Sequence, residues 1–364
     1  MDTKPLIVIL CPYPFNEAPS QRFRFEQQYS HLKTHFKIVQ LSFWSQKTNL
    51  ILYQKGELFQ KIIGLLSGLI GRFFHLFTIV NADIVLIHRE VIPVGSLFFE
   101  WYISKILHKK IIFDFDDAIW KLDTSDSNKS LEWLKNPNKF SKIISLSNSV
   151  ISGNNYLSNY AKKYNYNTTT IPSTIDISYH KPIKNRKKKE KICIGWTGSK
   201  TTIKHFNMLL PVLEKVKNKY SSQIYFKLIG DENYKRKEIE LQGTKWYLPS
   251  EIDDLQEIDI GIMPLPDDEW ANGKCGFKGL QYMALEIPTI MSPIGVNTEI
   301  IEHTKNGFLA DSNEDWIKYL SLLIEQKELR TCIGKEGRQT VINRYSVKSQ
   351  KENYLSALNE LISE

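Results

Sequence analysis

Residues 261–293 read GIMPLPDDEWANGKCGFKGLQYMALEIPTIMSP. The preceding apolar run predicts a buried strand over Ile258–Met263, which ends at Pro264. An acidic loop then leads to Gly273-Lys274-Cys275-Gly276-Phe277-Lys278 at the start of a predicted helix. Glycines and lysines at a helix entrance are typical of an anion site, because free amides and the positive end of the helix dipole attract phosphate. The segment therefore predicts a strand-to-helix turn that binds phosphate.

A second turn of this kind follows Ile192, where the chain reads IGWTGSKTTIKHFN from Ile194. Gly198 allows close approach of the backbone, Ser199 supplies a hydroxyl, and Thr201 or Thr202 is expected to cap a helix whose first turn carries Lys204. The motif alone also fits an ordinary strand-to-helix turn. Two such turns on one sheet edge suit a diphosphate.

Short apolar runs alternate with longer amphipathic stretches along the whole chain, a pattern typical of parallel α/β sheets. The expected strands are Leu6–Cys11, Phe36–Leu41, Ile84–His88, Lys110–Phe115, Ser149–Ser152, Ile192–Gly195, Gln223–Ile229, Ile258–Met263 and Thr289–Met291. In the first half, helices are expected from Ser20, Glu57, Gly95, Asn138 and Asn154. We therefore expect two doubly wound α/β domains, with a ligand cleft at the carboxyl ends of their strands.

Composition supports two ordinary domains. The chain has 364 residues, of which 42% are hydrophobic, and this excludes a disordered, collagen-like or coiled-coil protein. Its 48 Lys and Arg against 40 Asp and Glu give a net charge of +8, which favours anionic partners such as phosphates or an acidic membrane but is far from a nucleic-acid tail. The four cysteines have no metal-ligand spacing, and the N-terminus does not resemble a signal peptide, so we expect a reducing, cytoplasmic setting.

Two segments leave a membrane question open. Residues 57–80 carry bulky apolar side chains at helical spacing, but the continuous apolar run 62–70 is shorter than the roughly 20 residues of a spanning helix. A helix in the protein core and a surface helix that dips into lipid both fit. Residues 183–191 are rich in lysine, which fits either a solvated linker or a basic contact with an acidic membrane.

Phe113-Asp114-Phe115-Asp116-Asp117 places three carboxylates at the end of a predicted strand. Such carboxylates repel one another, so we expect a cation or sugar hydroxyls beside them, with helix capping as the alternative. His88 ends the preceding strand as a further site candidate, and Arg89 fits either a site role or an ion pair with Glu90.

The loop at residues 12–24 leads into the helix predicted from Ser20 and carries Arg22 and Arg24 in its first turn. An arginine there opposes the helix dipole unless an anion lies nearby. We predict that Ser20 and the two arginines contact a phosphate or the acceptor; pairing with Glu17 or Glu26 at the surface is the alternative.

The run Lys274–Pro288, followed by residues 294–301 and Asn306-Gly307-Phe308-Leu309, resembles the donor-binding half of retaining nucleotide-sugar glycosyltransferases of family 4, which have the two-domain GT-B fold. The strand ending in His88 and the segment Gly198–Lys204 also resemble family positions, and nearly the whole chain takes part. The resemblance implies a first domain over 1–182, a basic linker at 183–191, a donor domain over 192–345, and a last helix at 346–364 that returns to the first domain.

Two features depart from the family pattern. The usual pair of glutamates is absent, because Gly273 and Gln281 stand at those positions, and Ser199 replaces the arginine that binds the diphosphate. The amide of Gln281 can still hold ribose hydroxyls, because it both donates and accepts hydrogen bonds. Asp268 or Glu269 is then expected to contact the sugar, with Lys274 and Lys278 supplying the missing charge.

The resemblance implies a metal-independent, retaining, hexosyltransferase-like enzyme that uses UDP or GDP sugars, with no cofactor and no nucleic-acid partner. Its acceptor is expected to be a glycan or a lipid-linked glycan of the cell envelope, at the cytoplasmic face of the membrane. The predicted site residues are, for catalysis, Asp116, Asp117 and His88; for the donor, Gly198, Ser199, Lys204, Lys274, Gly276, Lys278, Gln281, Asn297 and Thr298; and for acceptor or phosphate, Ser20, Arg22, Arg24 and Arg89. A sugar-nucleotide epimerase and a non-catalytic binding protein are the alternatives.

Overall fold

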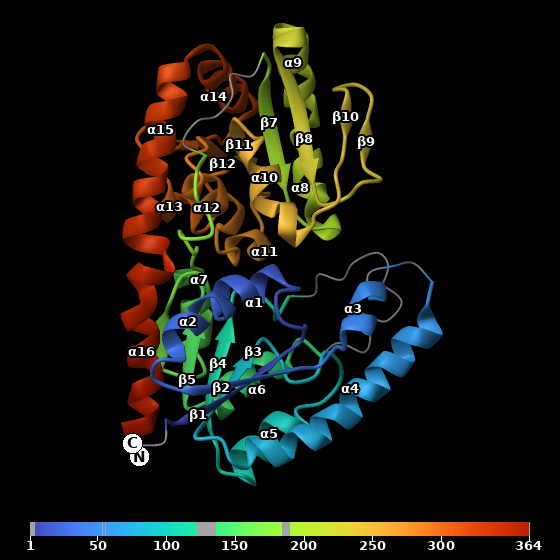
Figure 1. The fold of residues 1–364 in the computed structure, drawn as a ribbon, viewed down its shortest axis with the longest axis vertical. Helices are drawn as coiled ribbons and strands as arrows, with labels where there is room; N and C mark the ends of the chain where they lie inside the picture. Colours follow the sequence, from blue (N-terminus) through green and yellow to red (C-terminus); the bar gives the residue numbers. More distant parts are fainter. Residues whose placement is uncertain (1–3, 53, 55, 122–135, 184–189, 364) are drawn as a thin grey trace. The chain divides into compact units, whose positions relative to one another are not determined.

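The computed structural model describes residues 4–52, 54, 56–121, 136–183 and 190–363. The chain divides into two compact units (Figure 1). Unit 1 comprises residues 1–174 and 350–364, and unit 2 comprises residues 175–349. Each unit is built on a parallel sheet, as the alternation of apolar and amphipathic stretches predicts.

Unit 1 contains a six-stranded parallel sheet in the order β2-β1-β3-β4-β5-β6. Its strands are β1 (Leu6–Cys11), β2 (Lys37–Ser42), β3 (Ile84–His88), β4 (Lys110–Phe115), β5 (Ser149–Ser152) and β6 (Thr168–Thr170). Its helices are α1 (Pro19–Arg24), α2 (Tyr29–Leu32), α3 (Gln46–Ile51), α4 (Leu58–Ile79), α5 (Phe98–Lys105), α6 (Lys139–Leu146), α7 (Asn155–Ala161) and most of α16 (Val347–Ser363). On one face of the sheet, Tyr29, Tyr354 and Leu358 pack against Ile7 and Ile9, so α2 and α16 share a core.

Unit 2 contains a five-stranded parallel sheet in the order β13-β12-β11-β7-β8. Its strands are β7 (Ile192–Thr197), β8 (Ile224–Ile229), β11 (Ile260–Met263), β12 (Thr289–Met291) and β13 (Phe308–Leu309), beside a small antiparallel pair β9 (Lys235–Arg236) and β10 (Leu241–Gln242). Its helices are α8 (Ile203–Asn207), α9 (Leu210–Tyr220), α10 (Glu251–Gln256), α11 (Glu269–Asn272), α12 (Phe277–Ala284), α13 (Asn297–Ile300), α14 (Asn313–Glu325) and α15 (Lys327–Thr340). Both sheets are doubly wound, and ligands of such folds bind where the strand order reverses.

The boundary between the units lies at 174/175, not at the predicted residue 182. The reason is hydrogen bonding: Ile175 donates to the carbonyl of Tyr345, and the carbonyls of His180 and Lys181 accept from Arg338 and Gln256 of unit 2. The central part of the predicted basic linker, residues 184–189, lies outside the described residues.

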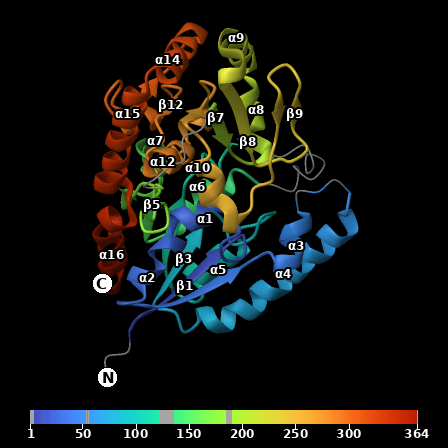
Figure 2. The ribbon, with the colours of Figure 1, turned by 45° about the horizontal axis from the view of Figure 1, so that its top comes forward.

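For residues 57–80 the sequence left a core helix and a surface helix open, and the structure has a surface helix, α4. In both ribbon views it runs beside α3 and α5 at the margin of unit 1 (Figures 1 and 2). The residues of α4 that are buried are Lys61, Gly64, Gly68, Arg72 and Ile79, whereas most of its bulky apolar side chains are exposed.

Candidate functional site

In unit 1, the predicted histidine lies where the order of the sheet reverses, at the end of β3. The Nδ1 atom of His88 lies 2.7 Å from Oδ2 of Asp114, and its Nε2 atom lies 3.4 Å from Oγ of Ser20. Because a carboxylate accepts the Nδ1 proton, the Nε2 atom of a neutral imidazole is left to accept a hydrogen bond. His88 itself is buried, so Ser20, which is half-buried, is the member of this chain nearest to solvent.

Asp114 also binds an arginine. The Nη2 atom of Arg24 lies 2.6 Å from Oδ1 of Asp114, and its Nη1 atom donates to the carbonyl of Ile171. Burial acts to raise the pKa of Asp114, but the charge of Arg24 and the hydrogen bond from His88 outweigh it and lower that pKa to about 2. Asp114 is therefore an ionised carboxylate that fixes both partners.

The alternative of surface pairing with Glu17 or Glu26 is wrong for Arg24, which is fully buried on Asp114. Arg22 is buried as well, with its guanidinium 5.0 Å from the centre of the Phe23 ring. The structure places Arg24 in the last turn of α1, where a basic side chain does not oppose the helix dipole, and balances its charge with a buried carboxylate of β4, a partner that the local sequence does not reveal.

The other two carboxylates at the end of β4 pair with Arg89. Its Nε atom donates to Oδ1 of Asp116 over 2.8 Å, and its Nη2 atom donates to Oδ2 of Asp117 over 2.5 Å. Burial acts to lower the pKa of Arg89, but the two carboxylates raise it. An ion pair of Arg89 with Glu90 is wrong, since Glu90 pairs with Lys139 at 2.7 Å. The mutual repulsion of the three carboxylates is relieved by two arginines.

In unit 2, the turn after β7 is built for close backbone packing. The amide of Gly198 donates to the carbonyl of Ile229, and a Cβ atom on Gly230 would lie 1.8 Å from the Gly198 oxygen. The hydroxyls of Ser199 and Thr201 lie 2.8 Å apart. Residues 200–202 form a 3-10 turn, and Thr202 stands at the N-cap of the five-residue helix α8, as expected, but its side chain makes no capping hydrogen bond.

The charges of the three predicted lysines of unit 2 all act on one residue, His205, opposed by the charge of Asp268. Burial is the main reason that the pKa of His205 is lowered to about 4, and the charges of Lys278, Lys274 and Lys204 lower it further. Lys278 also lies over the ring of Trp196, with its Cε atom 2.8 Å from where a Cβ on Gly198 would stand. The turn after β7 and the turn before α12 therefore form one cationic cluster, which we call the lysine cluster (Lys204, Lys274 and Lys278).

The start of α12 carries two further predicted residues. Gly276 has φ of +67° and leaves no room for a side chain, because a Cβ atom would lie 2.2 Å from Cδ1 of Ile300. Asn297 is buried and donates to the carbonyl of Ser292, while its Oδ1 atom has no hydrogen-bond partner among the described residues. The neighbouring Thr298 is exposed, and its hydroxyl donates to the carbonyl of Gly295.

Gln281 lies deeper than expected. It is 3% exposed, and its amide donates over 3.4 Å to Oε1 of Glu251, which also accepts from the indole of Trp246. Sequence reasoning missed Glu251, because it lies 30 residues from Gln281 and in no recognisable motif. Asp268, offered as a sugar contact, accepts from the amide of Ala271 and caps α11.

Among the described residues, no group of three His, Cys, Asp or Glu side chains is placed to hold a metal ion. A groove of about 760 Å³ lies in unit 1 between α5 and α6, but none of the predicted site residues line it.

Comparison with known proteins agrees with this description. Residues 179–340 match the family model described as glycosyl transferases group 1. No protein of curated function matches the chain in sequence.

Solved structures share the fold of the whole chain at low sequence identity. A glycosyltransferase from Rickettsia africae is 14% identical with a TM-score of 0.69, and the alignment covers 100% of this chain and 99% of that chain. Anabaena HepE with UDP and glucose is 11% identical with a TM-score of 0.66, covering 97% and 99%. A variant of S. aureus TarM with fondaparinux, alpha-GlcNAc-glycerol and UDP is 18% identical with a TM-score of 0.62, covering 80% and 59%.

Proposed function

Because the chain has the GT-B fold and its second unit carries the glycosyl transferases group 1 domain, we propose that it transfers a sugar from a nucleotide diphosphate sugar to a hydroxyl group. Unit 2 binds the donor, and unit 1 binds the acceptor. The fold alone supports many chemistries, so the assignment depends on the residues at the carboxyl edge of each sheet.

The observation that carries the proposal is the lysine cluster. Lys204, Lys274 and Lys278 each act on the buried His205, so three positive charges share one site at two strand-to-helix turns. When the bond to the anomeric carbon breaks, negative charge develops on the departing diphosphate, and fixed cations and amides lower that barrier. The lysines take the place of the arginine that stands at Ser199 in the family pattern.

The carboxylates of unit 1 support a retaining transfer without a protein nucleophile. Asp116 and Asp117 are both bound to Arg89, so neither carboxylate is poised to attack an anomeric carbon. We infer that an oxygen of the leaving phosphate takes the acceptor proton on the same face of the sugar. Nε2 of His88, fixed by Asp114, accepts the hydroxyl proton of Ser20, which leaves Oγ of Ser20 to accept a hydrogen bond from the substrate.

For the substrates, we propose a UDP or GDP hexose and a glycan or lipid-linked acceptor in the synthesis of cell-envelope polysaccharide, within the cytoplasm. Two structures of the same fold support UDP as the first donor to test: Anabaena HepE is described with UDP-glucose, and the S. aureus TarM variant with UDP and alpha-GlcNAc-glycerol.

The test is a thermal-shift panel of UDP, GDP, CMP and ADP sugars on the full chain, because a ligand that binds the folded state raises its apparent stability. Lys204→Ala/Lys278→Ala should lose the shift and lower turnover at least a hundredfold, whereas Lys335→Ala, an exposed lysine of α15, should keep both. A normal rate in the double variant would refute the role of the cluster. A free epimer formed without acceptor would identify an epimerase, and binding without transfer to any acceptor extract would identify a binding protein.

A further inference from the structure

Helix α4 is amphipathic with its apolar side outward. Its ten exposed large apolar residues, counting Val80 just after it, are Leu58, Phe59, Ile62, Ile63, Leu66, Ile70, Phe73, Phe74, Phe77 and Val80. At 3.6 residues per turn they occupy an arc of about 160°, and no polar residue falls within it. We call this arc the outer face of α4.

The opposite side of α4 carries small and charged residues, and it packs against the rest of unit 1. A Cβ on Gly64 would lie 2.4 Å from Thr48 of α3, and a Cβ on Gly68 would lie 2.6 Å from the ring of Phe43. Arg72 is buried and donates to the carbonyls of Cys11, Leu41 and Val91 over 2.8–2.9 Å. Glycines permit close packing, and the arginine satisfies carbonyls at the ends of strands, so the helix is anchored through its polar side.

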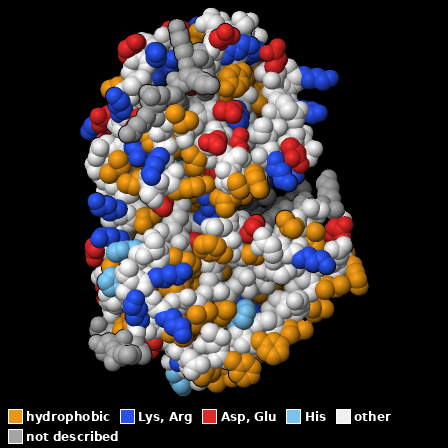
Figure 3. All heavy atoms as spheres, in the orientation of Figure 1, with side chains coloured by type: hydrophobic (Ala, Val, Ile, Leu, Met, Phe, Trp, Pro, Cys, Tyr) orange, Lys and Arg blue, Asp and Glu red, His pale blue; other side chains and the backbone are white. Residues whose placement is uncertain are grey.

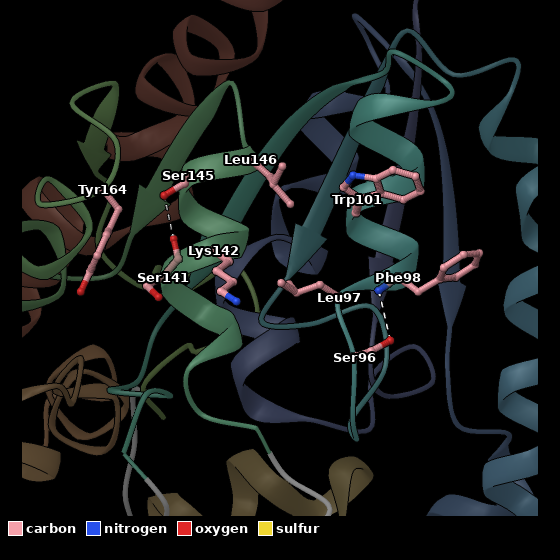
Figure 4. A pocket seen from close by; sticks show the side chains of 9 residues that line it. All are labelled: Ser96, Leu97, Phe98, Trp101, Ser141, Lys142, Ser145, Leu146 and Tyr164. Carbon is pink, nitrogen blue, oxygen red and sulfur yellow. Dashed lines mark hydrogen bonds between the residues drawn. The ribbon is translucent and has the colours of Figure 1, made fainter.

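The apolar surface continues onto α5. Phe73 lies against Phe99 and Phe98, with ring centres 5.0 and 6.3 Å apart, and Phe98, Trp101 and Ile106 are exposed. In the space-filling view, hydrophobic side chains follow the edge formed by α4 and α5 (Figure 3). The surface then reaches the groove between α5 and α6, where Leu97, Leu146 and Lys142 point into the space between the helices (Figure 4).

The exposed charges beside this surface are mainly positive. Helix α4 contains no acidic residue, although the exposed Glu57 stands directly before it, and the one acidic residue of α5, Glu100, is fully buried. The exposed charged side chains on α5 and at the groove are Lys105 and Lys142.

From this geometry we propose that the outer face of α4, with Phe98 and Trp101 of α5, docks onto an anionic lipid bilayer. Helix α4 has 22 residues, an apolar arc along its length and lysines nearby. These features are typical of a helix that lies in the membrane interface. A protein partner is less well matched, because protein interfaces carry about one hydrogen bond per 100–200 Å² and this arc offers none.

The helix lies on the bilayer and does not cross it. Its length and composition are sufficient for a membrane span, and 22% of its apolar window is buried in the protein. A membrane-spanning position, however, would break the hydrogen bonds of Arg72 to three carbonyls and would place Arg72 and Lys61 in hydrocarbon. The proposal does not depend on the transferase activity.

The test is flotation of the full chain with vesicles of phosphatidylcholine, alone or with one-third phosphatidylglycerol. We expect the protein to float with the anionic vesicles and to bind neutral ones more weakly. Phe74→Ser/Phe77→Ser should lower the partition at least tenfold, because it removes two exposed phenyl rings from the contact. The matched control is Tyr166→Ser/Tyr247→Ser, which removes two exposed rings elsewhere, 93% and 61% exposed against 65% and 74% for Phe74 and Phe77.

Circular dichroism melts of both variants check that they remain folded, so that a lost partition reports lost docking. No flotation of the unmodified protein, or equal loss in both double variants, would overturn the proposal. A dimer seen by sedimentation velocity without lipid would also overturn it, if Phe74→Ser/Phe77→Ser dissociated that dimer and left flotation unchanged. Retention in the membrane after alkaline carbonate extraction would show a spanning helix and would also contradict it.

Discussion

Arg24 and Asp114 form a fully buried ion pair, with Nη2 of the arginine 2.6 Å from Oδ1 of the aspartate. The two residues are 90 positions apart in sequence and join α1 to the end of β4. The same carboxylate holds His88, so one buried charge positions both a predicted anion-binding residue and a predicted catalytic residue. The pair couples the folding of unit 1 to the geometry of its candidate site.

The substitution Asp114→Asn should strongly destabilise unit 1. It leaves the Arg24 charge buried without its counter-ion, and breaking a buried pair in this way costs about 3–5 kcal/mol. Urea unfolding measures the change. Glu302→Gln, which breaks an exposed pair with Lys305, is the control and should cost about 1 kcal/mol or less. Equal effects of the two substitutions would contradict the structural role of Asp114.

The same carboxylate predicts an acid-dependent loss of stability. Its pKa is about 2 in the folded protein against 3.8 ordinarily, so it stabilises the fold above pH 4 and this contribution is lost as the pH falls toward 2. A pKa shift of this size corresponds to about 2 kcal/mol of folding free energy. Unfolding free energies measured from pH 5 to pH 2 should fall less steeply in Asp114→Asn than in the unmodified protein.

Arg89 combines a half-buried ion pair with a strained backbone. Its φ is +63°, a region that favours glycine, while its side chain binds Asp116 and Asp117. Arg89→Ala should destabilise the protein, because two adjacent and largely buried carboxylates lose their counter-ion. Arg89→Gly loses the same charge but relieves the strain, so its unfolding free energy should be higher than that of the alanine variant by about 1 kcal/mol. A lower unfolding free energy for Arg89→Gly than for Arg89→Ala would contradict backbone strain at this position.

The pKa of His205 reports on the lysine cluster. Burial and the charges of Lys278, Lys274 and Lys204 hold that pKa at about 4. Lys278→Ala removes one charge and should raise the pKa toward 6.5, although burial keeps it below that value. Binding of inorganic pyrophosphate to the unmodified protein should raise it in the same direction. Titration of the imidazole signals by NMR measures both effects, and Lys335→Ala, remote in α15, should leave the pKa unchanged.

Two glycines of α4 test how the helix is anchored. A Cβ on Gly68 would meet the buried ring of Phe43 at 2.6 Å, whereas a Cβ on Gly71 would have nothing within 4 Å. Gly68→Ala should therefore destabilise the protein by about 1–3 kcal/mol through overpacking. Gly71→Ala should stabilise it by about 0.5–1 kcal/mol, because alanine favours the helix and restricts the unfolded chain. Thermal unfolding compares the two, and the same sign for both would contradict the packing of α4.

Much of each sheet was predictable from the sequence. The strands Ile84–His88, Lys110–Phe115, Ser149–Ser152 and Thr289–Met291 were expected with the bounds that the structure has. Continuous apolar runs mark such buried strands locally. The expected strands omitted Thr168–Thr170, which is polar and partly exposed, and Phe308–Leu309, which has only two residues. Edge strands of this kind carry little local signal.

The pairing of charges was not predictable. The sequence indicated that Asp114, Asp116 and Asp117 have a cation or sugar hydroxyls beside them, and it marked Arg24 and Arg89 as site candidates, but it did not join the two sets. Strand order makes that connection, because β3 and β4 are neighbours and α1 follows β1 on the other side of β3. Which charged side chains can pair therefore depends on which strands are neighbours in the sheet.

The sequence by itself determined two parallel α/β sheets, the glycine- and lysine-rich turns of unit 2, and the helical spacing of residues 57–80, because these are local patterns of side chains. Only the tertiary structure decided that Arg24 binds Asp114 and that α4 turns its apolar side outward. Helical periodicity defines a face but not its direction. The direction followed from contacts distant in sequence, in which Arg72 and two glycines fit the protein surface and the phenylalanines do not.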